Sequence, residues 1–215
     1  MTLAEDQAVV LVHGLWMTGL DMLVLGRRLR RAGYRVRHFR YRSVRRGPGE
    51  NAARLAQFVE RIDAPVVHYV AHSLGGIVLL YLYERYPPAK PGRVVLLGSP
   101  VTGSSSAERL RRRPLGRWML GRSWRGGLDG NVPEWDGRRE LGVIAGTLGA
   151  GPGRLSGNRM PVPHDGTVAL AETRLAGASD RLEVRATHMG LLFTPRVARA
   201  VAGFLREGRF APQAR

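Results

Sequence analysis

The chain has 215 residues, a net charge of +17 and no cysteine. This length suits one domain with a sizeable core, and the lack of cysteine excludes disulfides, thiolate catalysis and cysteine metal sites. No window approaches the apolar stretch of about 20 residues that a membrane span needs. The N-terminal Met1-Thr-Leu-Ala-Glu-Asp-Gln has no basic region followed by an apolar core, so no signal peptide is expected. A cytoplasmic protein is therefore the default expectation.

The positive charge consists almost entirely of arginine. Lys90 is the only lysine, so 33 of the 34 basic residues are arginines, with local runs at 27–31, 35–46 and 109–113. Such dominance beside abundant glycine and alanine can come from a GC-rich coding sequence as easily as from a binding need. No nucleic-acid-binding motif accompanies the charge, so nucleic acid is an unlikely partner, and attraction to an anionic lipid surface or substrate is the better expectation.

Short apolar runs alternate with longer amphipathic stretches along the chain. The runs are at residues 8–13, 34–41, 66–71, 93–98, 141–146 and 181–186, and the stretches at 20–32, 50–62, 74–86 and 195–206. Parallel neighbours need crossover connections, so this alternation predicts a mostly parallel sheet of about six strands with helices on both faces. We expect residues 1–215 to form a single α/β domain.

Two stretches interrupt the alternation. Residues 101–140 carry Trp118, Trp124 and Trp135 among many arginines, and residues 147–164 are rich in glycine and proline. Long excursions from a compact α/β domain are usually functional or mobile. The first is a possible cap insertion, although its tryptophans could equally pack onto the sheet, and the second is expected to be a long loop.

Ser73 stands between a predicted strand and a predicted helix, in Ala71-His-Ser-Leu-Gly-Gly. Residues 71–75 are a variant of the G-x-S-x-G nucleophile elbow, in which small residues two positions either side of the serine avoid collisions in a sharp turn. The alternative is that Ser73 only caps the following helix. We favour the nucleophile because partners for it occur elsewhere in the chain.

A serine nucleophile needs a base, and six histidines compete for that role: His13, His38, His68, His72, His164 and His188. Only His188 lies between the last predicted strand and the last predicted helix, at the sheet edge where the elbow opens. His68 falls inside a strand, and the sharp turn should point the His72 side chain elsewhere.

The base in turn needs a carboxylate to orient it. Asp165 follows the fifth predicted strand and precedes a glycine suited to a tight turn, whereas its rivals Asp129, Glu134 and Asp136 all precede that strand. The resulting order, Ser73, Asp165 and His188, is the one expected of α/β-hydrolases. For the oxyanion hole we expect the backbone N–H groups of Leu15, after the first strand, and Leu74.

Together, Leu11-Val-His-Gly, the Ala71-His-Ser-Leu-Gly-Gly turn, Asp165-Gly-Thr-Val and Thr187-His-Met-Gly resemble a small serine esterase or lipase of the α/β-hydrolase family. The resemblance to compact bacterial lipases extends from about Val9 to Phe204. It implies two-step acyl transfer through an acyl-enzyme, without metal or organic cofactor. The arginine- and tryptophan-rich segment and the long loop before Asp165 depart from the family pattern and leave the substrate class open.

The resemblance also implies a mostly apolar pocket for a small-molecule ester with a hydrophobic acyl group. The side chains expected to line it, each of which could equally belong to the core, are those of Trp16, Met17, Leu74, Val101, Thr102, Val168 and Met189. Two alternatives stay open. One is an acyltransferase or thioesterase using the same three residues, and the other is a non-catalytic hydrolase-like protein that binds anionic partners.

Overall fold

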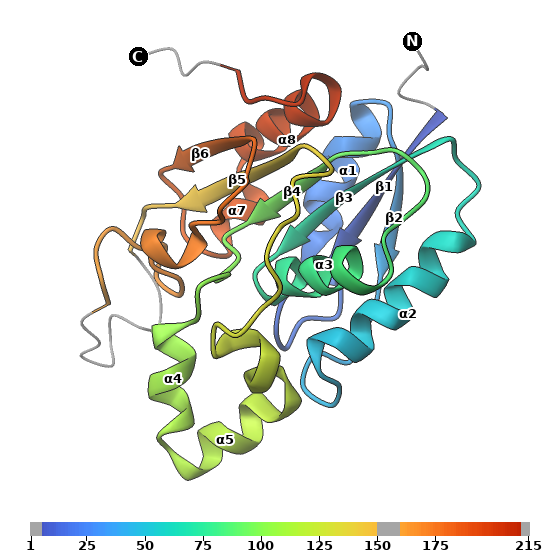
Figure 1. Ribbon diagram of the computed structural model, residues 1–215. Helices are drawn as coiled ribbons and strands as arrows, with labels where there is room; N and C mark the ends of the chain where they lie inside the picture. The colour runs from blue at the N-terminus through green and yellow to red at the C-terminus, as the bar shows by residue number, and fades with distance from the viewer. Residues whose placement is uncertain (1–5, 150–159, 212–215) are drawn as a thin grey trace.

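Six parallel strands form the single sheet of the structure, a computed structural model that describes residues 6–149 and 160–211 (Figure 1). The strands are β1 (Gln7–Val12), β2 (Arg35–Phe39), β3 (Val66–His72), β4 (Val94–Leu97), β5 (Leu141–Gly146) and β6 (Asp180–Val184). Their order in the sheet is β2-β1-β3-β4-β5-β6, and every neighbouring pair is parallel. This confirms the predicted α/β sheet of six strands.

Helices cover both faces of the sheet. One face carries α2 (Pro48–Glu60) and α3 (Leu74–Arg85), and the other carries α1 (Leu23–Arg31), α7 (Gly190–Phe193) and α8 (Pro195–Glu207) (Figure 1). Side chains of β1 alternate between the two cores, Val10 and Val12 facing the first, Val9 and Leu11 the second. Burial on both sides explains why the inner strands β1, β3, β4 and β5 read as nearly continuous apolar runs.

The helices start and end close to the predicted positions, for local physical reasons. The predicted helix at 20–32 begins as a separate 3₁₀ turn, η2 (Leu20–Met22), before α1. Pro48 and Pro195 occupy the first positions of α2 and α8, where the missing N–H costs nothing. Helix α3 ends at Arg85, just before Pro87-Pro88. Within the described ranges, no helix is both long and apolar enough to cross a bilayer.

The excursion after β4 contains helices that project from the sheet. These are α4 (Ser105–Arg111) and α5 (Pro114–Leu120), followed by short helical turns η3 (Gly121–Ser123) and η4 (Trp124–Leu128) (Figure 1). Trp135 is buried, with its ring centroid 4.7 Å from that of Tyr83, whereas Trp118 on α5 is 77% exposed. The tryptophans of this segment therefore divide between core packing and the outer surface.

Candidate active site

Ser73 occupies a strained turn between β3 and α3. Its backbone angles are φ 55° and ψ −125°, a region that residues with a side chain rarely adopt. The Ser73 N–H donates to the Leu97 carbonyl oxygen at 2.9 Å, which ties the turn to the neighbouring strand β4. The side chain makes no capping hydrogen bond to α3. The hydroxyl is therefore not used to satisfy the helix end.

Close packing of α3 against two strand ends requires the glycines that follow Ser73. A Cβ on Gly75 would lie 2.5 Å from the Val12 carbonyl oxygen, and one on Gly76 would lie 2.2 Å from Ser99 Oγ. The first contact is with backbone, which cannot move aside cheaply. Glycine at these positions lets the helix start directly beneath the end of β1, as a sharp elbow requires.

Asp165 and His188 form a buried pair joined by a short hydrogen bond. His188 Nδ1 lies 2.7 Å from Asp165 Oδ2, and the side chains are 9% and 1% exposed. The His188 backbone N–H also donates to the Asp165 carbonyl oxygen at 2.8 Å, so two contacts fix the loops together. Because the carboxylate accepts from Nδ1–H, the imidazole is left with Nε2 as its proton acceptor.

The Asp165 carboxylate is itself held by the tight turn that the sequence predicted. Its Oδ1 accepts the backbone N–H groups of Thr167 at 2.9 Å and Val168 at 2.7 Å, and Gly166 supplies the positive φ of 94° within that turn. These bonds orient Oδ2 toward His188. Of the long loop before Asp165, residues 150–159 lie outside the described ranges.

All three residues lie at the carboxyl edge of the sheet. A Cβ on Gly98, directly after β4, would lie 3.2 Å from both Asp165 Oδ2 and His188 Nδ1. Gly98 follows Leu97, the residue whose carbonyl holds the Ser73 turn. The neighbour of the serine, His72, has its ring centroid 4.5 Å from that of His188. The structure therefore brings together the serine turn, the imidazole and the carboxylate.

His72 has a role that the sequence did not indicate. Its ring packs beside His188, and its Nε2 lies 3.1 Å from the His188 carbonyl oxygen. Burial, together with the nearby His188, holds the pKa of His72 well below its usual value. A neutral ring that donates from Nε2 can hold the backbone of the His188 loop without adding charge. Its place at the end of a strand, immediately before the serine, was the only available signal.

Two other histidines are occupied by structural hydrogen bonds. His13 Nε2 accepts the Tyr41 N–H at 3.3 Å, and His13 Nδ1 bonds the Gly14 carbonyl oxygen at 2.9 Å. His68 Nδ1 accepts the Arg93 N–H, and its Nε2 contacts Gln7 Oε1, both at 2.9 Å. Burial lowers the pKa of both rings, that of His68 to about 4. Neither ring is available to the serine as a base.

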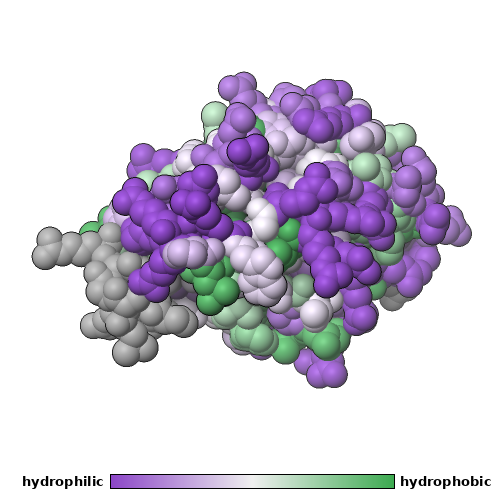
Figure 2. All heavy atoms as spheres, turned by 90° about the horizontal axis from the view of Figure 1, so that it is seen from below, coloured by the Kyte–Doolittle hydropathy of each residue, from purple (hydrophilic) through white to green (hydrophobic). Residues whose placement is uncertain are grey.

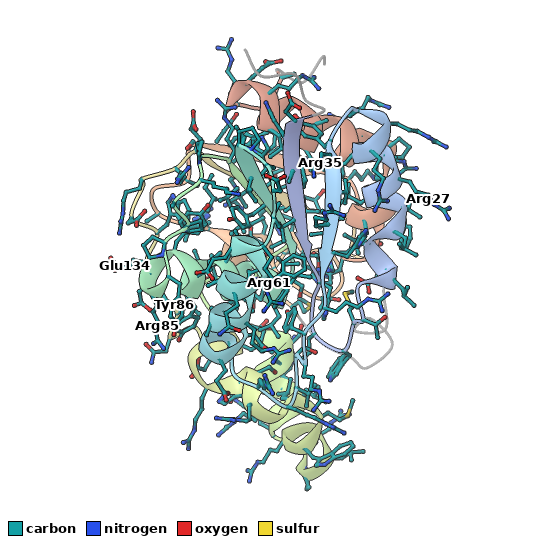
Figure 3. The ribbon with its side chains drawn as sticks, turned by 90° about the vertical axis from the view of Figure 1, so that its right-hand side faces the viewer. Arg27, Arg35, Arg61, Arg85, Tyr86 and Glu134 are labelled. Carbon is teal, nitrogen blue, oxygen red and sulfur yellow. The ribbon has the colours of Figure 1, made fainter. Side chains whose placement is uncertain are left out.

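The rival carboxylates point elsewhere. Asp129 accepts the backbone N–H groups of its own turn, including that of Gly127 at 3.1 Å. Asp136 pairs with Arg138 at 2.6 Å, and Glu134 lies on the outer surface (Figure 3). Among the described carboxylates, Asp165 alone is bonded to His188.

The sequence matches a known protein family along most of its length. The model of the alpha/beta hydrolase family matches residues 9–211. The chain belongs to the alpha/beta hydrolase family. None of the curated proteins compared with it matches its sequence.

Solved structures show the same fold at low identity. The lipase BlEst2 of Bacillus licheniformis, in mature form, has a TM-score of 0.69 and 19% identity, covering 94% of this chain and 91% of its own. The metagenomic carboxyl esterase MGS0156 has a TM-score of 0.68 and 20% identity, covering 94% and 76%. The pyrethroid hydrolase PytH has a TM-score of 0.62 and 15% identity, covering 94% and 98%. At these identities the likeness concerns the fold.

In this alpha/beta hydrolase, the loop after β1 lies beside the elbow. A Cβ on Gly14 would lie 3.0 Å from Ser73 Cβ, and the next residue is Leu15, one expected oxyanion donor. The other, Leu74, is the first residue of α3, where helical N–H groups have no partner within the helix. Trp16 anchors the loop: its N–H donates to Ser43 Oγ at 3.1 Å and its indole N–H to the Met119 carbonyl oxygen at 2.9 Å.

The expected pocket residues differ in exposure. Trp16 is 53% exposed, Met189 is 40% exposed, and Thr102 is exposed at the start of the excursion. Met17 is partly buried, with its sulfur 3.3 Å from the Gly14 nitrogen, whereas Val101 and Val168 are buried.

Across the described part of the chain, no three histidine or acidic side chains gather as a metal site would require.

Proposed function

We propose that this chain is a serine hydrolase that cleaves carboxylic esters through an acyl-enzyme. The observation that carries the proposal is the 2.7 Å hydrogen bond between His188 Nδ1 and Asp165 Oδ2, at the edge where Ser73 occupies its strained turn. A buried carboxylate that orients an imidazole next to a serine elbow is the arrangement that activates a hydroxyl near neutral pH.

In the proposed mechanism, Ser73 Oγ attacks the ester carbonyl carbon while His188 Nε2 takes its proton. Asp165 stabilises the imidazolium that forms. The N–H groups of Leu15 and Leu74 donate to the oxyanion of the tetrahedral intermediate. His188 then protonates the departing alkoxide, and water attacks the acyl-enzyme by the same steps in reverse. This chemistry requires no metal or organic cofactor.

A hydrophobic acyl group is the substrate feature we propose. The side chains bordering the two loops beside Ser73, from Trp16 and Met17 to Met189, are mostly apolar and partly exposed. Apolar surface left accessible at a site favours an apolar ligand. The lipase BlEst2 and the carboxyl esterase MGS0156, which share the fold, support the proposal of an ester substrate.

The decisive experiment combines a substitution with covalent labelling. Ser73→Ala should reduce hydrolysis of nitrophenyl butyrate and octanoate by about four orders of magnitude or more, because the nucleophile is gone. A fluorophosphonate probe should modify the intact protein at Ser73 and leave the variant unlabelled. The matched control is Ser105→Ala, since Ser105 Oγ is buried without a hydrogen-bond partner. Unchanged turnover in Ser73→Ala would disprove the proposed mechanism.

A further inference from the structure

Four arginines line one hollow outside the proposed active site. The hollow has a volume of about 460 Å³ and is bordered by Gly47, Arg111, Arg117, Leu120, Gly121, Arg122, Trp124 and Arg125. No carboxylate lines it. Figure 2 views the molecule from the side to which α4 and α5 project, and hydrophilic side chains gather there around smaller pale and apolar areas.

Neighbouring groups hold three of these arginines in place. The guanidinium carbon of Arg111 lies 4.9 Å from the centroid of the Trp124 ring. Arg117 donates from Nε to the Arg111 carbonyl oxygen at 3.3 Å, and Arg122 pairs with Glu50 at 3.1 Å. Each contact uses only part of a guanidinium, so most N–H donors stay available. The side chains are ordered before any ligand arrives, which reduces the entropy cost of binding.

The hollow also carries uncompensated positive charge. Within the described chain, Arg122 is the only one of the four with a carboxylate partner. Residues 109–128 contain seven arginines and no acidic residue, and Asp129 is engaged by the backbone of its own turn. The other three guanidinium groups line the same hollow without a carboxylate partner among the described residues and repel one another, and a bound anion would relieve that repulsion.

We propose that this hollow binds a phosphate-class polyanion, either a phosphomonoester or a pyrophosphate. The planar guanidinium fork matches the oxygens of phosphate through paired N–H donors. The volume lies within the range of about 300–1,000 Å³ typical of small-molecule sites. The same chemistry is offered by a free phosphate compound and by a lipid phosphate headgroup. The site does not depend on the proposed ester hydrolysis.

A second hollow provides an internal comparison. It has a volume of about 400 Å³ between α1 and α8 and is also lined by four arginines, Arg28, Arg31, Arg199 and Arg206. Its other lining residues are alanines and a proline, with no aromatic ring. Of its arginine side chains, Arg28 alone is anchored within the described residues, through the Phe193 carbonyl oxygen. Equal charge without an ordered framework should bind a phosphate weakly.

The test measures pyrophosphate binding by titration calorimetry at constant ionic strength. Arg117→Gln with Arg125→Gln should weaken binding about tenfold or more, because two donors of charge-assisted bonds are lost. The matched control, Arg31→Gln with Arg199→Gln, removes the same charge from exposed side chains of the second hollow and should change the affinity less than twofold. Thermal unfolding without ligand checks that both variants remain folded.

A second arm separates the two sources of phosphate. It compares flotation with vesicles of phosphatidylcholine alone and with equal parts of phosphatidic acid. If the first double variant loses pyrophosphate binding and vesicle binding together, the hollow also accepts a lipid headgroup. If the variant loses pyrophosphate binding but still binds the vesicles, the site takes free phosphate compounds. Absence of pyrophosphate binding to the unmodified protein, or equal losses in the two double variants, would overturn the proposal.

Discussion

Asp165 is the residue whose chemistry can be tested most selectively. Asp165→Asn keeps the size of the side chain but can offer an N–H to His188 Nδ1 in place of an acceptor. The imidazole would then carry its proton on the wrong nitrogen, and ester turnover should fall about 10⁴-fold. Steady-state kinetics on nitrophenyl butyrate give the measurement.

The control for this change is Asp136→Asn. Asp136 pairs with the exposed Arg138, and exposed ion pairs contribute little to stability. We expect activity within twofold of the original protein. A larger loss in Asp136→Asn than in Asp165→Asn would mean that the wrong carboxylate has been assigned.

His68 should make stability depend on pH. Its pKa is lowered from 6.5 to about 4, mainly by burial, so the folded protein binds a proton at His68 less readily than the unfolded chain. The neutral His68 therefore stabilises the folded protein by about 3 kcal/mol above pH 6.5, and this stabilisation is lost as the pH falls toward 4. The free energy of unfolding, measured with urea at pH 4 to 7, should fall accordingly.

The matched variant for this pH dependence is His68→Asn, whose side-chain oxygen can still accept the Arg93 N–H. The slope of its free energy of unfolding against pH should be smaller over the same interval. The difference between the two slopes should correspond to at most one bound proton. Equal slopes in the two proteins would place the pH dependence on other groups.

At the level of single residues, the sequence predicted those candidates that depend on local pattern. Ser73 was proposed from the small residues around it, and His188 and Asp165 from their places after predicted strands; their catalytic roles stay predictions. The position of the His72 ring was not predictable, because it depends on contact with a loop 116 residues later. Nor could the sequence show that Trp16 bonds the backbone of Met119.

Two glycines in helices allow the packing at the elbow to be tested. Gly75→Ala would place a Cβ 2.5 Å from the Val12 carbonyl oxygen, whereas nothing lies within 4 Å of a Cβ on Gly203 in α8. We expect Gly75→Ala to lower the free energy of unfolding by about 2 kcal/mol or more. Gly203→Ala should raise it by about 0.5–1 kcal/mol, because alanine is the better helix former.

Chemical denaturation of both variants provides the measurement. A stable Gly75→Ala protein with full activity would show that the end of β1 can move away from α3. The loop after β1, which carries the proposed oxyanion donor Leu15, would then be less rigid than the close contacts of Gly14 and Gly75 indicate.

Elements with at least one buried face were the most predictable from sequence. All six strands and the helices α1, α2, α3 and α8 were recognised, since apolar runs and amphipathic periods report burial directly. The sequence did not predict the helices α4 and α5. These helices are only seven residues each, which is too short to show a clear periodicity, and the exposed Arg112 and Arg113 lie between them. Whether this segment serves as a cap over the site remains a prediction.

The whole molecule carries more positive charge than its ion pairs can balance. Five of the six described salt bridges join surface side chains, and only the pair of His188 and Asp165 is buried. Exposed pairs contribute about 0–1 kcal/mol each. Against them stands the mutual repulsion of a net charge of +17. Repulsion should therefore dominate the response of this protein to salt.

The resulting prediction is that sodium chloride stabilises the fold. Between about 10 and 300 mM salt the Debye length shortens from about 30 Å to less than 10 Å, so repulsion between distant arginines is screened. The thermal unfolding midpoint should rise over this range, and chloride is used because phosphate could bind the arginine-lined hollow. If surface ion pairs dominated, the midpoint would fall instead.

A triple variant separates screening from specific chloride binding. Arg27, Arg35 and Arg61 are exposed, lie away from α4 and α5 (Figure 3) and form no described salt bridge. Replacing all three with glutamine lowers the net charge and leaves both hollows intact. Its midpoint should be higher than that of the original protein at low salt and should rise less as salt is added. An unchanged salt dependence would mean that chloride acts at a site, and that long-range repulsion contributes little to the stability of the fold.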